Sequence, residues 1–221
     1  MNKLKLLFLA LVLSLSSAAA TIDTNVDLVY AWGDQYVWSV QRYNYTGEKT
    51  YGYQSHGSGV WVNDTTMITA CHVPTPYEDG MWASANGHFE INVDMVVEFC
   101  HEYKDQAVMS VVAGKQHEIE PVVFGELPKR GERVYVVGYP SEFPLTVTSG
   151  WFIGKSVRRT NGDDAAWLLA AQAFGGNSGG AVVVVRNGVV ELVGILTNGL
   201  PSGDLTIMRD LEHSKAWLAY H

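Results

Sequence analysis

One serine of this chain lies among four glycines, in the stretch Gly-Gly-Asn-Ser-Gly-Gly at residues 175–180. Glycine adopts backbone conformations that a Cβ forbids, and it lets a substrate approach the main chain closely. The amide N–H groups beside Ser178 could therefore donate to a negatively charged oxygen that develops during attack on a carbonyl. Most Gly-Ser-Gly clusters are turns or linkers, so this motif alone indicates a nucleophile only weakly.

A histidine and an aspartate upstream supply the other groups that such a serine needs. His72 ends the apolar stretch at residues 68–72, and Asp105 opens another apolar run at residues 105–109. A serine hydroxyl is a poor nucleophile near neutral pH and needs a base within hydrogen-bond reach. Histidine suits that task, and a carboxylate on its second ring nitrogen fixes the tautomer and stabilises the imidazolium. Taken singly, each residue is more simply explained as structural; the combination favours acyl transfer.

The order and surroundings of these residues resemble the trypsin-like (chymotrypsin-fold) serine peptidases of the bacterial and viral branch. That family carries a Thr-Ala-x-His block, an Asp-x-Ala-hydrophobic block and a Gly-x-Ser-Gly-Gly block, and its Gly-x-x-Val…Gly-Tyr-Pro strand is similar to residues 131–140. The likeness covers roughly residues 50–210. It implies that Ser178 is the nucleophile, His72 the base and then the acid, and Asp105 the orienting carboxylate. The N–H groups of Gly176 and Ser178 would form the oxyanion hole.

The pattern along the chain is that of an all-β protein. Short runs rich in Val, Ile, Tyr and Trp recur between Gly, Pro, Asn and Asp, and almost nothing before residue 205 has helical periodicity. The resemblance implies two six-stranded antiparallel β-barrels with a short C-terminal helix and the active site in the cleft between the barrels. We expect a peptidase domain over residues 48–221, with these parts: first barrel about 48–112, connection within 112–118, second barrel about 119–208, helix about 210–220, docked on the second barrel.

The N-terminus has the pattern of a secretory signal peptide. Lys3 and Lys5 precede an apolar run at residues 6–15, and three alanines follow at 18–20. We expect cleavage after residue 20 and a secreted or periplasmic protein that has no membrane segment once cleaved; an uncleaved anchor is the alternative. Residues 21–47 would form an N-terminal extension, and an inhibitory or docking role for it stays open.

Charge argues against a nucleic-acid partner. The formal net charge is −8, and the one basic cluster is short. It comprises Lys155, Arg158 and Arg159. The expected partners are protein or peptide substrates, and a monomer is the expected form.

No metal ion or other cofactor is expected. The stretch His-Glu-Tyr-Lys-Asp at residues 101–105 begins like a zinc-protease motif but lacks its second histidine, and its surroundings indicate a strand rather than a helix.

The two cysteines lie close to the proposed catalytic residues. Cys71 directly precedes His72, and Cys100 lies five residues before Asp105. Five residues of extended strand span about 16 Å, which is more than a disulfide can bridge. We therefore expect two free thiols. A disulfide is the alternative, because an extracytoplasmic protein with an even number of cysteines permits one.

The resemblance also implies a substrate pocket. Gln172 would lie at its base, and Ala173, Leu196 and Gly199 would form its wall. Because Gln172 is neutral and Leu196 stands where glutamate-specific relatives carry a histidine, we expect an apolar or small residue on the acyl side of the cut bond. Asp204 is the alternative determinant, since a carboxylate near the pocket floor would select Lys or Arg.

Asn177 departs from the animal digestive enzymes, in which an acid at this position receives a newly cut N-terminus. This departure implies activity without that activation step. The predicted function is a secreted serine endopeptidase that works through an acyl-enzyme. The alternative is a binding or structural protein on the same scaffold with a blocked or misaligned triad.

Overall fold

The computed structural model of this protein describes residues 23–45, 51–74, 80–85, 92–114, 118–141, 143–155, 166–199 and 204–221. The predicted signal peptide lies outside the described residues, as do Arg158 and Arg159 of the basic cluster. None of the described helices is long and apolar enough to span a membrane.

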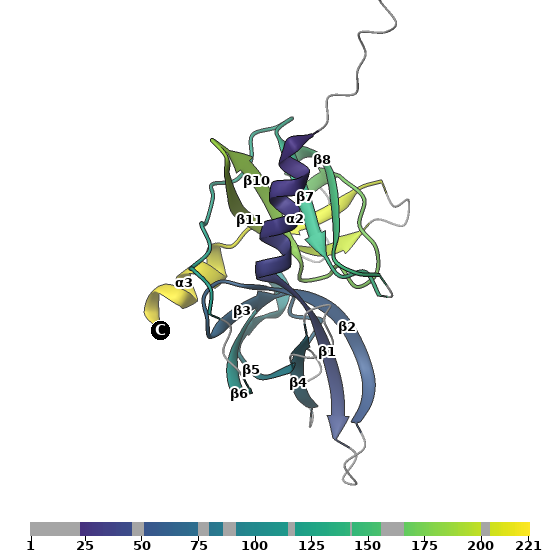
Figure 1. The fold of residues 1–221 in the computed structure, drawn as a ribbon, viewed down its shortest axis with the longest axis vertical. Helices are drawn as coiled ribbons and strands as arrows, with labels where there is room; N and C mark the ends of the chain where they lie inside the picture. The colour runs from purple at the N-terminus through teal and green to yellow at the C-terminus, as the bar shows by residue number, and fades with distance from the viewer. Residues whose placement is uncertain are drawn as a thin grey trace, which may run out of the picture.

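Six antiparallel strands form the first barrel: β1 (Val37–Tyr45), β2 (Tyr51–Trp61), β3 (Thr66–Thr69), β4 (Gly80–Ala85), β5 (Asn92–His101) and β6 (Gln106–Gly114). They close in the order β1-β2-β3-β6-β5-β4, in the lower half of Figure 1. Residues 37–40 of strand β1 are all buried, and Trp38 and Val40, two positions apart on one face of the strand, share a core cluster. The Trp38 ring meets that of Trp61 edge to face, with centroids 5.2 Å apart, and Met67 and Met109 are fully buried in the same cluster.

Six further antiparallel strands form the second barrel: β7 (Arg133–Gly138), β8 (Thr146–Lys155), β9 (Trp167–Ala170), β10 (Ala181–Arg186), β11 (Val189–Gly199) and β12 (Thr206–Arg209). They close in the order β10-β11-β12-β9-β8-β7. The turn between β10 and β11 is the predicted Asn-Gly turn, with φ of 53° at Asn187 and 78° at Gly188. The predicted all-β fold class, with two six-stranded antiparallel barrels, is confirmed.

The N-terminal extension is part of the folded domain. Strand β1 belongs to the first barrel, which therefore begins at Val37, earlier than the predicted boundary near residue 48. Helix α2 (Thr24–Tyr36) precedes it, so the expectation that almost nothing before residue 205 is helical was wrong. The helix lies across the second barrel (Figure 1), where a Cβ on Gly33 would come within 2.5 Å of a Val137 methyl. Tertiary packing thus stabilises a helix that the sequence periodicity does not indicate.

Helix α3 (Glu212–Tyr220) follows β12 and matches the predicted C-terminal helix near residues 210–220. The expectation that it docks on the second barrel was only partly right, because its hydrogen bonds reach the first barrel. Gln106 at the start of β6 bonds to Ser214 of the helix. Leu211 and Leu218 join an apolar cluster that contains residues of both barrels. The helix therefore packs at the junction of the two barrels (Figure 1).

Candidate active site

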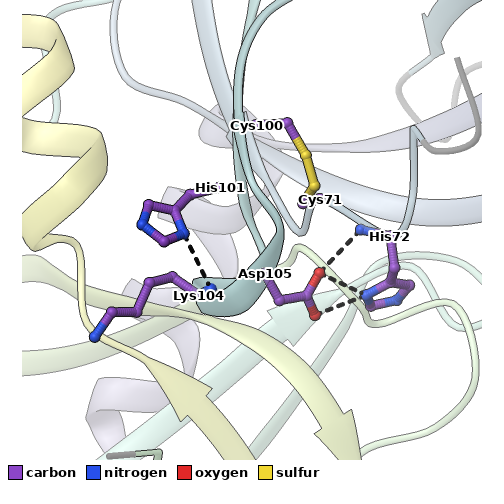
Figure 2. Close-up of a disulfide and its surroundings, with 6 residues drawn as sticks. All are labelled: Cys71, His72, Cys100, His101, Lys104 and Asp105. Atoms are coloured by element: carbon purple, nitrogen blue, oxygen red, sulfur yellow. Dashed lines mark hydrogen bonds and ion pairs between the residues drawn. A yellow bond between two sulfur atoms is a disulfide. The ribbon is translucent and has the colours of Figure 1, made fainter. Parts of the chain in front are cut away.

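His72 and Asp105 are joined by three hydrogen bonds (Figure 2). The ring Nδ1 of His72 lies 2.8 Å from Asp105 Oδ2 and 3.0 Å from Oδ1, and the backbone N–H of His72 donates to Oδ1 at 2.9 Å. A carboxylate can only accept, so Nδ1 carries the proton in the neutral ring and Nε2 is left as the acceptor. The His72 side chain is 47% exposed and that of Asp105 only 16%. The pair therefore presents a fixed histidine base to the surface of the site.

Strand pairing brings this histidine and aspartate together. Strands β3 and β6 are antiparallel neighbours, with Thr69 opposite Ala107. The residues that follow β3 and precede β6 therefore meet at the same end of the barrel. Asp105 adopts a left-handed backbone conformation, with φ 51° and ψ 49°, after the 3-10 turn η1 (Glu102–Lys104). Aspartate tolerates this conformation better than most residues, because its short side chain can bond locally.

Cys71 and Cys100 form a disulfide beside this pair (Figure 2), so the expectation of two free thiols was wrong. Their Cα atoms are 5.5 Å apart. The prediction assumed that residues 100–105 run on as an extended strand. Instead, η1 reverses the chain between β5 and β6, and Cys100 pairs with Ala107 rather than lying a full strand length from Asp105. The bridge ties the segment that carries His72 to the strand that leads to Asp105.

Ser178 approaches this pair from the second barrel. Its carbonyl accepts a hydrogen bond of 2.7 Å from the backbone N–H of Ser58 on β2, so the serine loop docks on the first barrel. Its hydroxyl donates to the carbonyl of Thr197 on β11 at 3.4 Å, a long and weak bond. Among the described residues, no hydrogen bond joins Ser178 to His72. In this structure His72 is bonded to Asp105, and the Ser178 hydroxyl is bonded to the Thr197 carbonyl instead of to His72.

Hydrogen bonds anchor two carbonyl groups of the glycine loop before Ser178, and one of these bonds fixes the direction of the Gly176 N–H, a predicted oxyanion donor. The Gly175 carbonyl accepts from the Ser141 N–H at 2.9 Å and from its hydroxyl at 3.0 Å, and the Gly176 carbonyl accepts from the Ser58 hydroxyl at 2.8 Å. Because a trans peptide directs its C=O and N–H in opposite directions, this anchoring orients the Gly176 N–H away from Ser141. Within the described part of the chain, the N–H groups of Gly176 and Ser178 have no hydrogen-bond partner. They are free to bind an oxyanion.

Comparison with known proteins identifies the family. The family model described as trypsin-like peptidase domain matches residues 57–195. The chain belongs to the trypsin-like peptidase family. A relative from Arabidopsis thaliana, putative protease Do-like 12, mitochondrial, is 27% identical over an alignment of 146 residues that covers 62% of this chain and 28% of that protein. The chain thus spans under a third of that relative's length.

Solved structures share the fold. The Rv3671c protease from M. tuberculosis in its active form superposes with a TM-score of 0.68 at 19% identity, over 86% of this chain and 82% of that one. An inactive form of the same protease gives a TM-score of 0.65 at 20% identity, over 87% and 91% of the two chains. At this identity the likeness shows the chymotrypsin-like fold alone.

The predicted pocket residues of this trypsin-like peptidase are partly brought together. A Cβ on Gly199 would lie 3.8 Å from the Ala173 carbonyl, so these two residues are neighbours. Gln172 is exposed, and its carbonyl accepts from the Thr148 hydroxyl at 2.6 Å. Leu196 is only 2% exposed and belongs to the core cluster of the second barrel against which Ala173 packs.

Asp204 is exposed at the start of the segment that leads to β12. Among the described residues, it makes no hydrogen bond or ion pair with the other predicted pocket residues. The structure therefore places Asp204 at the surface without linking it to Gln172.

Two groups near the serine loop were not anticipated from the sequence. The Thr197 hydroxyl is buried and has no hydrogen-bond partner in the described residues, next to the carbonyl that holds Ser178. His56 on β2 places its buried, unpartnered Nδ1 close to Gly176, while its Nε2 lies 2.9 Å from the Ser39 hydroxyl. Burial lowers the pKa of His56. No local sequence signal marks either residue, because their positions depend on contacts between distant strands.

A separate cavity of about 770 Å³ lies along residues 124–132 and strands β10 and β11, away from His72. Its half-buried arginine is already paired, since Arg186 bonds to Glu132 and Glu191 at 2.8 Å each. The hydrogen bond from Arg186 lowers the pKa of Glu132. The described residues that line this cavity include no serine, cysteine or histidine, so it does not repeat the chemistry of the site at His72. Among the described residues, no group of three His, Cys, Asp or Glu side chains is placed to hold a metal ion.

Proposed function

We propose that this protein is a secreted serine endopeptidase that hydrolyses peptide bonds through an acyl-enzyme on Ser178. The observation that carries the proposal is the pairing of His72 with both carboxyl oxygens of Asp105, beside a serine loop in which the N–H groups of Gly176 and Ser178 have no partner among the described residues. Membership of the trypsin-like peptidase family supports the same reaction class.

Each step of the reaction uses a group that the described residues supply. The Ser178 hydroxyl leaves the weak bond to Thr197 and gives its proton to Nε2 of His72 as its oxygen attacks the carbonyl carbon. The charge on the former carbonyl oxygen is stabilised by the N–H groups of Gly176 and Ser178. The imidazolium, held by Asp105, then protonates the leaving amine. A water molecule, deprotonated by His72, attacks the ester and releases the acid and the free serine.

Secretion and substrate preference are finer parts of the proposal. The signal-peptide pattern at residues 1–20 directs the chain out of the cytoplasm, and the Cys71–Cys100 disulfide suits an oxidising compartment. For the residue on the acyl side of the cut bond, the neighbouring Ala173 and Gly199 favour a small or apolar side chain. The exposed Asp204 is the one predicted pocket residue that could select a basic side chain instead.

A fluorophosphonate probe and a peptide library test the proposal. We expect wild-type protein to be labelled on Ser178 and to cleave mainly after small or apolar residues. Ser178→Ala and His72→Ala should each lower kcat by about six orders of magnitude, and Asp105→Asn by about four, with folding retained. Ser110→Ala, a serine of β6 outside the site, is the matched control and should keep full labelling.

The second candidate is a binding or structural protein on this scaffold. It is favoured by one observation, that the Ser178 hydroxyl bonds to Thr197 rather than to His72. Folded wild-type protein that neither reacts with the probe nor cleaves any library peptide would support this candidate and refute the endopeptidase. Cleavage mainly after Lys or Arg would refute only the preference for apolar residues. Asp204→Ser should then abolish the preference for Lys or Arg.

A further inference from the structure

We propose that helix α3 positions the catalytic pair through Gln106, so that the C-terminal segment of the second barrel holds Asp105 in place on the first. This inference rests on the catalytic role proposed for Asp105. Gln106 touches neither substrate nor His72 and acts only through its neighbour in the chain, which makes it a positioning residue.

The Gln106 side chain is fully buried and bonded to the beginning of α3. It is 0% exposed, as is Ser214 of the helix. Its Oε1 accepts from the Ser214 hydroxyl at 2.8 Å and from the Ser214 N–H at 3.3 Å, and its amide nitrogen donates to the Asp210 carbonyl. Water cannot replace these partners in a buried site, so losing one leaves a polar group unsatisfied. Gln106 is therefore a fixed point one residue from Asp105.

The hairpin that carries Asp105 is held on both of its strands. His101, the last residue of β5, pairs with Gln106, the first residue of β6, and the turn between them contains Asp105. The His101 ring lies 4.5 Å from that of His213, the residue before Ser214. In Figure 2, His101 points to the side opposite the one on which Asp105 meets His72. Helix α3 thus contacts one side of the β5–β6 hairpin, and His72 contacts Asp105 on the opposite side.

The same contacts continue into the second barrel. Asp210, whose carbonyl accepts from Gln106, also accepts at its carboxylate from the Trp167 ring N–H of β9 at 3.1 Å. A continuous set of bonds therefore runs from β9 through Asp210 and Gln106 to Asp105. Because Ser178 belongs to the second barrel and Asp105 to the first, this set of bonds fixes how the two halves of the site face each other.

Asp105 needs such support because its backbone is in the left-handed region, with φ 51°. Aspartate tolerates this conformation better than most residues, but it still costs more than for glycine, and contacts around the turn offset that cost. Without the Gln106 anchor, the turn can relax, and the carboxylate then shifts relative to the His72 ring. A misplacement of about 1 Å at a reacting group can cost about 100-fold in rate.

Gln106→Met tests the proposal, because methionine fills a similar volume but forms none of the three bonds. We expect kcat to fall by about 10- to 100-fold with KM within about twofold of wild type. Ser214→Ala removes one bond only, so it is the milder variant if Gln106→Met fails to fold, and it should give a smaller fall in kcat with KM again unchanged. Val190→Ala, a buried position near the β10–β11 turn, is the control for loss of stability alone and should leave kcat unchanged.

A spectroscopic readout separates this inference from the proposed function. The Nδ1 proton that His72 shares with Asp105 should give a far-downfield proton NMR signal in wild-type protein, and this signal should weaken or broaden in Gln106→Met but not in Val190→Ala. If both Gln106→Met and Ser214→Ala keep normal kcat and this signal, the positioning role is refuted. If wild-type protein has the signal but no activity, the endopeptidase proposal fails. The effect of Gln106→Met on the signal then still tests whether Gln106 holds Asp105 in position beside His72.

Discussion

Replacing both cysteines with alanine should lower the free energy of unfolding by about 3.5 kcal/mol. The disulfide joins residues 29 positions apart, and closing a loop of this length removes about 12 cal/mol/K of chain entropy from the unfolded state. At 25 °C this corresponds to the stated free energy. Because Cys71 is only 2% exposed, losing its sulfur from the core adds to the effect rather than offsetting it.

Urea unfolding of the oxidised protein, the reduced protein and the Cys71→Ala/Cys100→Ala variant measures this contribution. The reduced protein and the variant should unfold at similarly lower urea concentrations. Their m-values should rise, because an unfolded chain without the cross-link exposes more surface. Two free thiols in denatured wild-type protein, or a difference below about 1 kcal/mol between the oxidised and reduced forms, would refute the reasoning.

Two further outcomes follow from single residues. Gly179→Ala should lower the free energy of unfolding, measured in urea, by about 3 kcal/mol, because Gly179 has φ of 83° and a Cβ there would collide with the Ser58 carbonyl. The control Gly131→Ala, with φ of 80° and open space around the position, should lower it by only about 1 kcal/mol, and equal losses would contradict the steric argument. His56 should make the protein acid-sensitive: its folded pKa is lowered, so the unfolded state binds the proton more tightly and stability falls as pH drops below the unfolded value of about 6.5. His56→Gln should reduce the shift of the urea midpoint between pH 7.5 and pH 5.5, and an unchanged shift would count against this assignment.

The features that the sequence predicted correctly depend on short-range patterns. The turn at Asn187 and Gly188 requires two positive φ values, and this dipeptide supplies them wherever it occurs between apolar runs. The all-β class follows in the same way from many short apolar runs of strand length, whereas the two-barrel architecture was implied by the family resemblance. Family motifs around His72, Asp105 and Ser178 were recognisable because each occupies a few consecutive residues. Their catalytic roles remain predictions that the proposed experiments test.

The features that were missed depend on contacts between distant residues. Helix α2 contains β-branched and aromatic residues and Gly33, which disfavour a helix in isolation. It forms because Val29 is fully buried and Gly33 allows close contact with Val137 of the second barrel. The disulfide was missed because the reversal of the chain at residues 102–104 has no glycine or proline to signal it.

Each of the two helices α2 and α3 packs on a barrel other than the one to which it is joined in the chain. Helix α2 leads into β1 of the first barrel yet covers the second, and α3 follows β12 of the second barrel yet bonds to β6 of the first. Helix α2 therefore covers part of the second barrel, and α3 covers part of the first. If a protease cut the connection between β6 and β7, the contacts of α2 and α3 would still hold the two fragments together. Removing either helix would expose apolar surface on the barrel that it covers. We therefore expect the two barrels and both helices to fold as one unit rather than as two independent barrels.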